Sequence, residues 1–167
     1  LNQLEKQEIY KKLTDRMSSV TTDKFQGVEY WNSYPKDSIT YGNSRFNLSI
    51  PMKKGAPEMH LVMSYSGDRW IFFDRIRILA EDEIIFDKKF SREEIARDHE
   101  SGSVWELVNI KITDDIARMA SKLGSAKKVT VRFSGEKIFD YEMESEEIDN
   151  FAKLAEIYDE LQPALDK

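Results

Sequence analysis

The chain has 167 residues, of which 40% are hydrophobic, 11% aromatic and 34% charged, and its formal net charge is -6. This length and composition predict about one globular domain and exclude a disordered chain. The acidic balance argues against a general nucleic-acid binder, which needs a basic face, and no apolar run approaches the roughly 20 residues of a membrane-spanning helix.

The first twenty residues have the pattern of a helix. Ile9, Leu13 and Met17 recur at a spacing of four residues and therefore share one face. The apolar stripe is narrow, as in a helix that packs lightly on a domain or leads into it. We therefore expect a helix or lead-in, one globular α+β domain and a short tail, over residues 1–22, 23–162 and 163–167.

Between Phe25 and Ile112 the apolar pattern changes to a period of two, which is typical of strands. The stretch 70–79 is expected to be one long strand, with Trp70, Phe72 and Ile76 on one side. Because apolar and polar residues alternate, the sheets should be antiparallel with one wet face. The strands are expected near residues 28–31, 46–52, 59–65, 70–79, 84–86 and 104–112.

The last third of the chain shows helix and hairpin signals. Thr113 can cap a short helix near 114–123, and Gly124 can end that helix in a left-handed conformation. A hairpin over 129–143 follows, and a C-terminal helix is expected near 146–161. The predicted fold class is α+β, with a mainly antiparallel, two-layer or sandwich-like sheet and these three helices.

Several ordered patterns occur together in this chain. They are Tyr65-Ser66-Gly67-Asp68-Arg69-Trp70-Ile71-Phe72-Phe73-Asp74, Val104-Trp105-Glu106, Thr113-Asp114-Asp115, Val131-Arg132-Phe133-Ser134-Gly135-Glu136-Lys137 and Tyr158-Asp159-Glu160-Leu161. Over roughly residues 61–161 the chain thereby resembles an uncharacterised type of small bacterial domain found in secreted proteins and lipoproteins. The resemblance implies a place outside the cytoplasmic membrane and a lipid tether upstream of Leu1, and it implies no activity.

The sequence contains no recognisable catalytic or metal-binding motif. It has no cysteine, which removes thiolate metal sites and cysteine nucleophiles. His60 and His99 lie far apart, and the turns at Gly67 and Gly135 do not have the pattern of phosphate-binding loops. We therefore expect no catalytic residue, no metal and no cofactor.

Three arginines form the first candidate binding site. Arg75 and Arg77 share one face of a predicted strand, and Arg132 lies in another. If the strands are neighbours, three guanidinium groups could hold a carboxylate or phosphate. The alternative is cross-strand pairing with acidic neighbours, namely Asp74, Glu136 or Asp140.

Aromatic residues in a polar stretch form the second candidate. Trp31 and Tyr41 could contribute to an exposed platform for a sugar or peptide. Trp70 and Trp105 lie in apolar strands and are expected to fill the core.

These observations favour a non-enzymatic, extracytoplasmic binding or structural domain. Its partner is an unknown protein or small ligand rather than a nucleic acid. One alternative is a cytosolic or phage-encoded protein-interaction module. The other is a hydrolase that uses Asp or Glu with Arg75 or Arg132, which a strongly raised carboxylate pKa in a cleft would favour.

Overall fold

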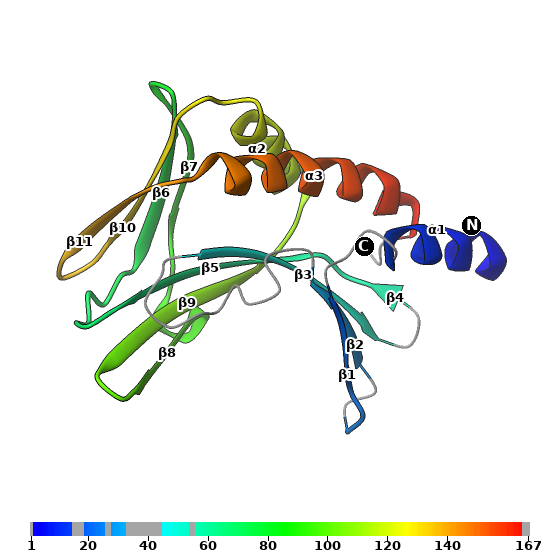
Figure 1. Ribbon diagram of the computed structural model, residues 1–167, viewed down its shortest axis with the longest axis horizontal. Helices are drawn as coiled ribbons and strands as arrows, with labels where there is room; N and C mark the ends of the chain where they lie inside the picture. Colours follow the sequence, from blue (N-terminus) through cyan, green and yellow to red (C-terminus); the bar gives the residue numbers. More distant parts are fainter. Residues whose placement is uncertain (1, 15–18, 26–27, 33–44, 54–55, 165–167) are drawn as a thin grey trace.

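The structure is a computed structural model that describes residues 2–14, 19–25, 28–32, 45–53 and 56–164. It confirms the α+β class, with antiparallel sheets and helices at both the N-terminal and C-terminal ends of the described chain. The four-stranded sheet stands at one end of the molecule, and the seven-stranded sheet extends away from it beneath the helices (Figure 1).

The larger sheet has the order β1-β2-β3-β5-β9-β8, with the short β4 paired to β3. Every pairing in it is antiparallel. Its strands are β1 (Ser19–Asp23), β2 (Val28–Asn32), β3 (Arg45–Lys53), β4 (Ala56–Pro57), β5 (His60–Gly67), β8 (Ile95–Glu100) and β9 (Ser103–Lys111).

The smaller sheet has the order β11-β10-β6-β7 and is also antiparallel throughout. Its strands are β6 (Arg75–Ala80), β7 (Glu83–Lys89), β10 (Val129–Ser134) and β11 (Ile138–Glu142). Ile76, Ile78, Val131 and Phe133 are fully buried on the inner face of this sheet. The residues between them point to the opposite face, as the period of two requires.

The helices are α1 (Gln3–Thr14), α2 (Asp114–Gly124) and α3 (Ser145–Leu161), with short 3₁₀ turns η1 (Arg92–Glu94) and η2 (Gln162–Ala164). α3 crosses above the seven-stranded sheet with α2 beside it (Figure 1). Phe151 of α3 meets Phe46 of β3 edge to face, with ring centroids 5.4 Å apart. This contact anchors the amphipathic face of α3 on the core.

Gly124 has a different role from the one that the sequence suggested. It is the last residue of α2 and is not among the described residues with a positive φ. A Cβ at this position would lie 2.7 Å from the backbone of Ala152 in α3. The glycine therefore lets the two helices approach closely, and the expected left-handed cap is wrong.

Two further expectations about elements are wrong, and one strand was not predicted. The first helix ends at Thr14, and β1 begins at Ser19, where the sequence pattern suggested helix. The expected strand over 70–79 begins only at Arg75, because residues 70–74 form part of a connection between the sheets. The edge strand β8 was not expected, since its burial is confined largely to Ile95.

Within the part of the chain that the structure describes, no helix is long and apolar enough to span a membrane.

Candidate functional site

The loop over residues 68–74 joins the two sheets, and a buried carboxylate fixes its shape. Glu106 of β9 is fully buried, and its Oε2 accepts hydrogen bonds from the backbone N–H groups of Ile71 (2.9 Å) and Phe72 (3.1 Å). Its Oε1 accepts another from the N–H of Phe73 at 3.1 Å. Three successive N–H groups thus form a concave anion-binding nest that an internal carboxylate fills.

Arg97 of β8 balances the charge of this carboxylate. Its Nε donates to Oε1 of Glu106 at 2.7 Å, and its Nη2 donates to the carbonyl oxygen of Phe73 at 2.8 Å. The Arg97 side chain is 21% exposed, whereas that of Glu106 is not exposed at all. Arg97 also lies over the ring of Phe72, 5.5 Å from its centroid. The guanidinium is therefore held in place while part of it stays open to solvent.

The four-stranded sheet holds the other side of the same loop. The N–H of Asp74 donates to the carbonyl oxygen of Ser134 at 3.0 Å. A Cβ at Gly135 would lie 2.0 Å from the carbonyl oxygen of Phe72, so the turn between β10 and β11 needs glycine at this point. The loop is consequently clamped between both sheets.

This clamp supports an unusual backbone conformation at Phe72. Its φ is +48°, which is rare for a bulky residue that is not glycine. Phe72 is 43% exposed, although both neighbours, Ile71 and Phe73, are buried. Such strain persists only where surrounding contacts fix it, and it concentrates at functional sites.

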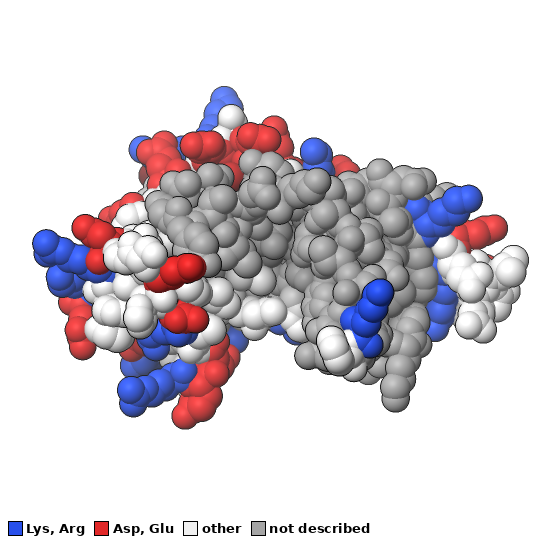
Figure 2. Space-filling view, turned by 60° about the horizontal axis from the view of Figure 1, so that its bottom comes forward, with Lys and Arg blue, Asp and Glu red and all other residues white. Residues whose placement is uncertain are grey.

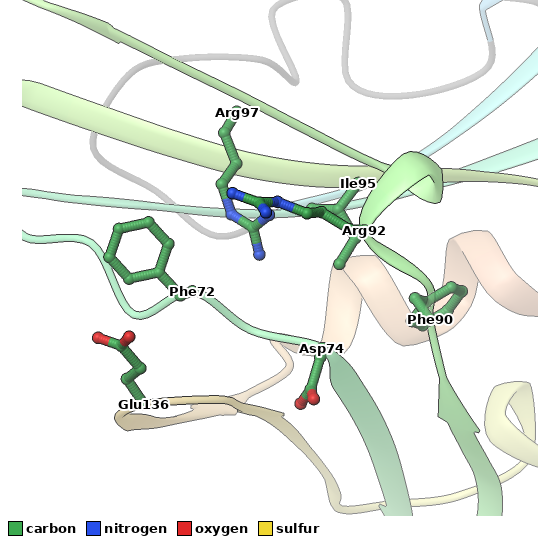
Figure 3. A pocket seen from close by; sticks show the side chains of 7 residues that line it. All are labelled: Phe72, Asp74, Phe90, Arg92, Ile95, Arg97 and Glu136. Atoms are coloured by element: carbon green, nitrogen blue, oxygen red, sulfur yellow. The ribbon is translucent and has the colours of Figure 1, made fainter.

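A pocket of about 720 Å³ opens where this loop meets β8, η1 and the β10–β11 turn (Figure 3). We call it the intersheet pocket, because the segments around it come from both sheets. Seven residues line it: Phe72, Asp74, Phe90, Arg92, Ile95, Arg97 and Glu136.

The charged side chains of the intersheet pocket divide into two walls. Arg92 and Arg97 extend from one side of the pocket, and Asp74 and Glu136 come from the other side (Figure 3). Among the described residues, no ion pair joins the two walls, and the side chains of Arg92 and Glu136 make no hydrogen bond. The Asp74 carboxylate lies 3.9 Å from the Nζ of Lys89, a residue that does not line the pocket. Both walls therefore keep capacity for a ligand.

An aromatic strip adjoins the pocket at Phe72. The ring of Phe72 stacks on Trp70, with centroids 5.7 Å apart and planes inclined by 20°. His99 meets Trp70 edge-on at 6.4 Å. In the space-filling view, acidic and basic side chains border one another over the described part of this end of the molecule (Figure 2).

The three arginines proposed from the sequence do lie on neighbouring strands. Arg77 of β6 is opposite Arg132 of β10, and Arg75 is two residues away on the same face. Arg132 is held bidentately by Asp140 at 2.7 and 2.8 Å, which is the cross-strand pairing considered above. Arg75 is held in the same way at 2.8 and 2.7 Å by Asp87, an acid that was not considered. Nε of Arg77 is buried and has no hydrogen-bond partner among the described residues.

These pairs shift the titration of their members. The hydrogen bonds from Arg75 and from Arg132 lower the pKa of Asp87 and of Asp140, respectively. A backbone hydrogen bond from Ser91 lowers the pKa of Glu94. In the described part of the chain, every carboxylate with a perturbed pKa is shifted downward. The hydrolase alternative, which needs a raised carboxylate pKa, gains no support from these groups.

The structure describes the aromatic candidates only in part. Trp31 lies in β2 opposite Val20 and Ile50, and of this residue the structure describes only the strand position. Tyr41 lies outside the described residues. Trp70 and Trp105 are half-buried rather than fully buried, and Trp70 packs against the edge of the core.

Metal-binding side chains do not gather in the described residues: no group of three or more His, Asp or Glu could hold an ion there. The ring nitrogens of His60 instead contact Asn109 (2.8 Å) and Glu58 (2.9 Å).

Neither the clamped loop over residues 68–74 nor the intersheet pocket was predicted from the sequence, although one signal was present. Glu106 interrupts the apolar face of a strand whose neighbours Val104 and Val108 are buried. A carboxylate at such a position requires buried hydrogen-bond donors, because an unpaired buried charge is very costly. That requirement would have pointed to an unseen partner segment.

Comparison with known proteins gives no relative from which a function could be carried over. No protein-family description, curated protein or solved structure matches this chain. The resemblance to secreted and lipoprotein-type domains therefore stays a prediction, and the intersheet pocket is the feature that bears most directly on function.

Proposed function

We propose that this chain is a binding domain whose ligand occupies the intersheet pocket. The observation that carries the proposal is the pocket itself, with a volume of about 720 Å³ and two oppositely charged walls. Small-molecule sites usually have volumes of about 300–1,000 Å³ and combine apolar lining with a few convergent polar groups. Phe72, Phe90 and Ile95 supply the apolar lining here.

The rigidity of one wall supports the same proposal. Arg97 is fixed by Glu106 and by the carbonyl oxygen of Phe73, so it loses little freedom when a ligand binds. Phe72 is held with its ring partly exposed in a conformation that an unconstrained chain avoids. A binding site gains affinity when its groups are ordered before the ligand arrives.

A screen of small fragments by saturation-transfer NMR tests this proposal. The same library is screened against the wild-type chain and the variants Arg92→Gln and Arg118→Gln. Arg92 lines the pocket, whereas Arg118 is an exposed arginine of α2 that pairs with Asp115. We expect Arg92→Gln to weaken most hits by about tenfold, the size of one charge-assisted contact, and Arg118→Gln to leave them unchanged. If Arg92→Gln leaves the affinity of the hits unchanged, the binding site lies elsewhere.

We further propose that the domain works outside the cytoplasmic membrane. The support for this is the sequence resemblance over residues 61–161. The test is to express the protein with its natural flanking sequence in its own host and to add protease to intact cells. Degradation by the added protease is the expected result. If the protein is instead protected and is recovered in the cytosolic fraction, the intracellular interaction module is favoured.

A further inference from the structure

We infer that the intersheet pocket selects a dipolar ligand, in which an anionic group and an ammonium group are separated by an apolar segment. This inference rests on the proposed binding function and names the chemical class of the ligand. A short peptide with free ends belongs to this class.

The arginine wall fits the anionic end. A guanidinium group carries five N–H donors, and Arg97 uses two of its five in the bonds to Glu106 and Phe73. Arg92 keeps all of its donors free of other described side chains, and it lies on the same side of the pocket as Arg97 (Figure 3). A carboxylate in the pocket can accept charge-assisted hydrogen bonds from the remaining donors of these arginines.

The acidic wall fits the cationic end. The Glu136 carboxylate points from the β10–β11 turn toward the side of the arginines, whereas the Asp74 carboxylate points away from them in this view (Figure 3). The Nζ of Lys89, whose side chain is 77% exposed, already lies 3.9 Å from Asp74. Glu136 has no such partner among the described residues, so we assign it the larger part in holding an ammonium group.

The two walls together exclude simpler ligands. A purely anionic ligand that reaches the arginines is repelled by Asp74 and Glu136. A purely cationic ligand that reaches these acids is repelled by the arginines. Phe72, Ile95 and Phe90 also line the pocket. Their apolar surface suits a hydrophobic segment that separates the two charged ends.

Calorimetric titration of the full chain with four forms of one tripeptide, Ala-Phe-Ala, tests the inference. The forms have both ends free, an acetylated N-terminus, an amidated C-terminus, or both ends blocked. We expect the free form to bind, and each single block to weaken binding by about tenfold or more. Equal binding of all four forms would overturn the inference and leave the binding function intact.

Variants assign each end of the ligand to its wall. Arg92→Gln should reduce the penalty for amidation but not that for acetylation, and Glu136→Gln should do the reverse. Glu93→Gln is the matched control, because Glu93 is exposed beside Arg92 and does not line the pocket. If both penalties survive in both variants, the assignment is wrong.

If no form of the tripeptide binds, the fragment screen described above shows whether the dipolar preference or the binding function itself has failed. Pocket-directed hits that carry both charges would then support the inference. Pocket-directed hits that carry a single charge would overturn the dipolar preference while the binding function stands. An absence of pocket-directed hits would overturn both.

Discussion

Replacement of Glu106 by glutamine should destabilise the protein strongly. The carboxylate accepts four hydrogen bonds, two on each oxygen, and the side chain is completely buried. The amide of glutamine keeps only one accepting oxygen, so two donors lose their acceptor whichever way it turns. Each buried donor without a partner costs about 1–3 kcal/mol, and the partly buried Arg97 also loses its counter-charge.

Together these losses predict a decrease of about 3–5 kcal/mol in the free energy of unfolding, out of the about 5–15 kcal/mol that is typical of a domain. Urea denaturation followed by tryptophan fluorescence measures the change. Glu100→Gln, at the exposed end of β8, is the control and should change the free energy by less than about 0.5 kcal/mol. A loss below about 1 kcal/mol in Glu106→Gln would refute the account of the loop clamp.

A second variant, Gly135→Ala, should cost about 3 kcal/mol, the upper end of the overpacking range, because the new Cβ would lie 2.0 Å from the carbonyl oxygen of Phe72 and the backbone must move. Gly102→Ala meets no atom within 4 Å but requires a φ of +83°, so it should cost only about 1–2 kcal/mol; thermal denaturation ranks the two, and the opposite order would contradict this reading. Burial, and then a hydrogen bond of 2.5 Å to Asp114, raises the pKa of Tyr158 to about 12. Because this value lies above the 10.0 of an ordinary tyrosine, the stabilisation is complete below pH 10 and is lost as the pH rises through about 12. Tyr158→Phe should therefore lose less stability than the wild type between pH 10 and 12, and equal losses would show that another group controls this range.

The regular elements could be predicted because their local patterns agree with their final environment. Strict alternation marked β5 and β10, whose inward residues are buried as expected. The capping residue Thr113 marked the start of α2, and its hydroxyl oxygen does accept a hydrogen bond from the N–H of Ile116. In such segments the period of the apolar residues is a sufficient guide.

The loop over 70–74 could not be predicted in the same way. Its sequence is apolar and aromatic, which locally favours a strand. Its conformation is imposed by Glu106, which lies 35 residues beyond Ile71 in the chain. A contact at that sequence separation leaves no periodic signal, so the tertiary hydrogen bonds override the local preference.

The intersheet pocket escaped prediction for a related reason. Its lining comes from the loop that joins the sheets, from η1 and β8, and from the turn after β10. Arg92, Arg97 and Glu136 each occur in an ordinary charged stretch, and only the pairing of the strands brings them together. Of the three arginines that the sequence did single out, Arg75 and Arg132 are engaged by carboxylates on the outer face of the smaller sheet.

The most direct test of the account is to map ligand binding on the folded chain, residue by residue. The amide signals of the ¹⁵N-labelled protein are recorded during titration with free Ala-Phe-Ala or, if it does not bind, with the strongest hit of the fragment screen. The account predicts that the largest shifts fall on residues 71–74, 92–97 and 134–137, which surround the intersheet pocket. Shifts concentrated on the outer face of the smaller sheet, around Arg77, would contradict it and return attention to the arginines of that face.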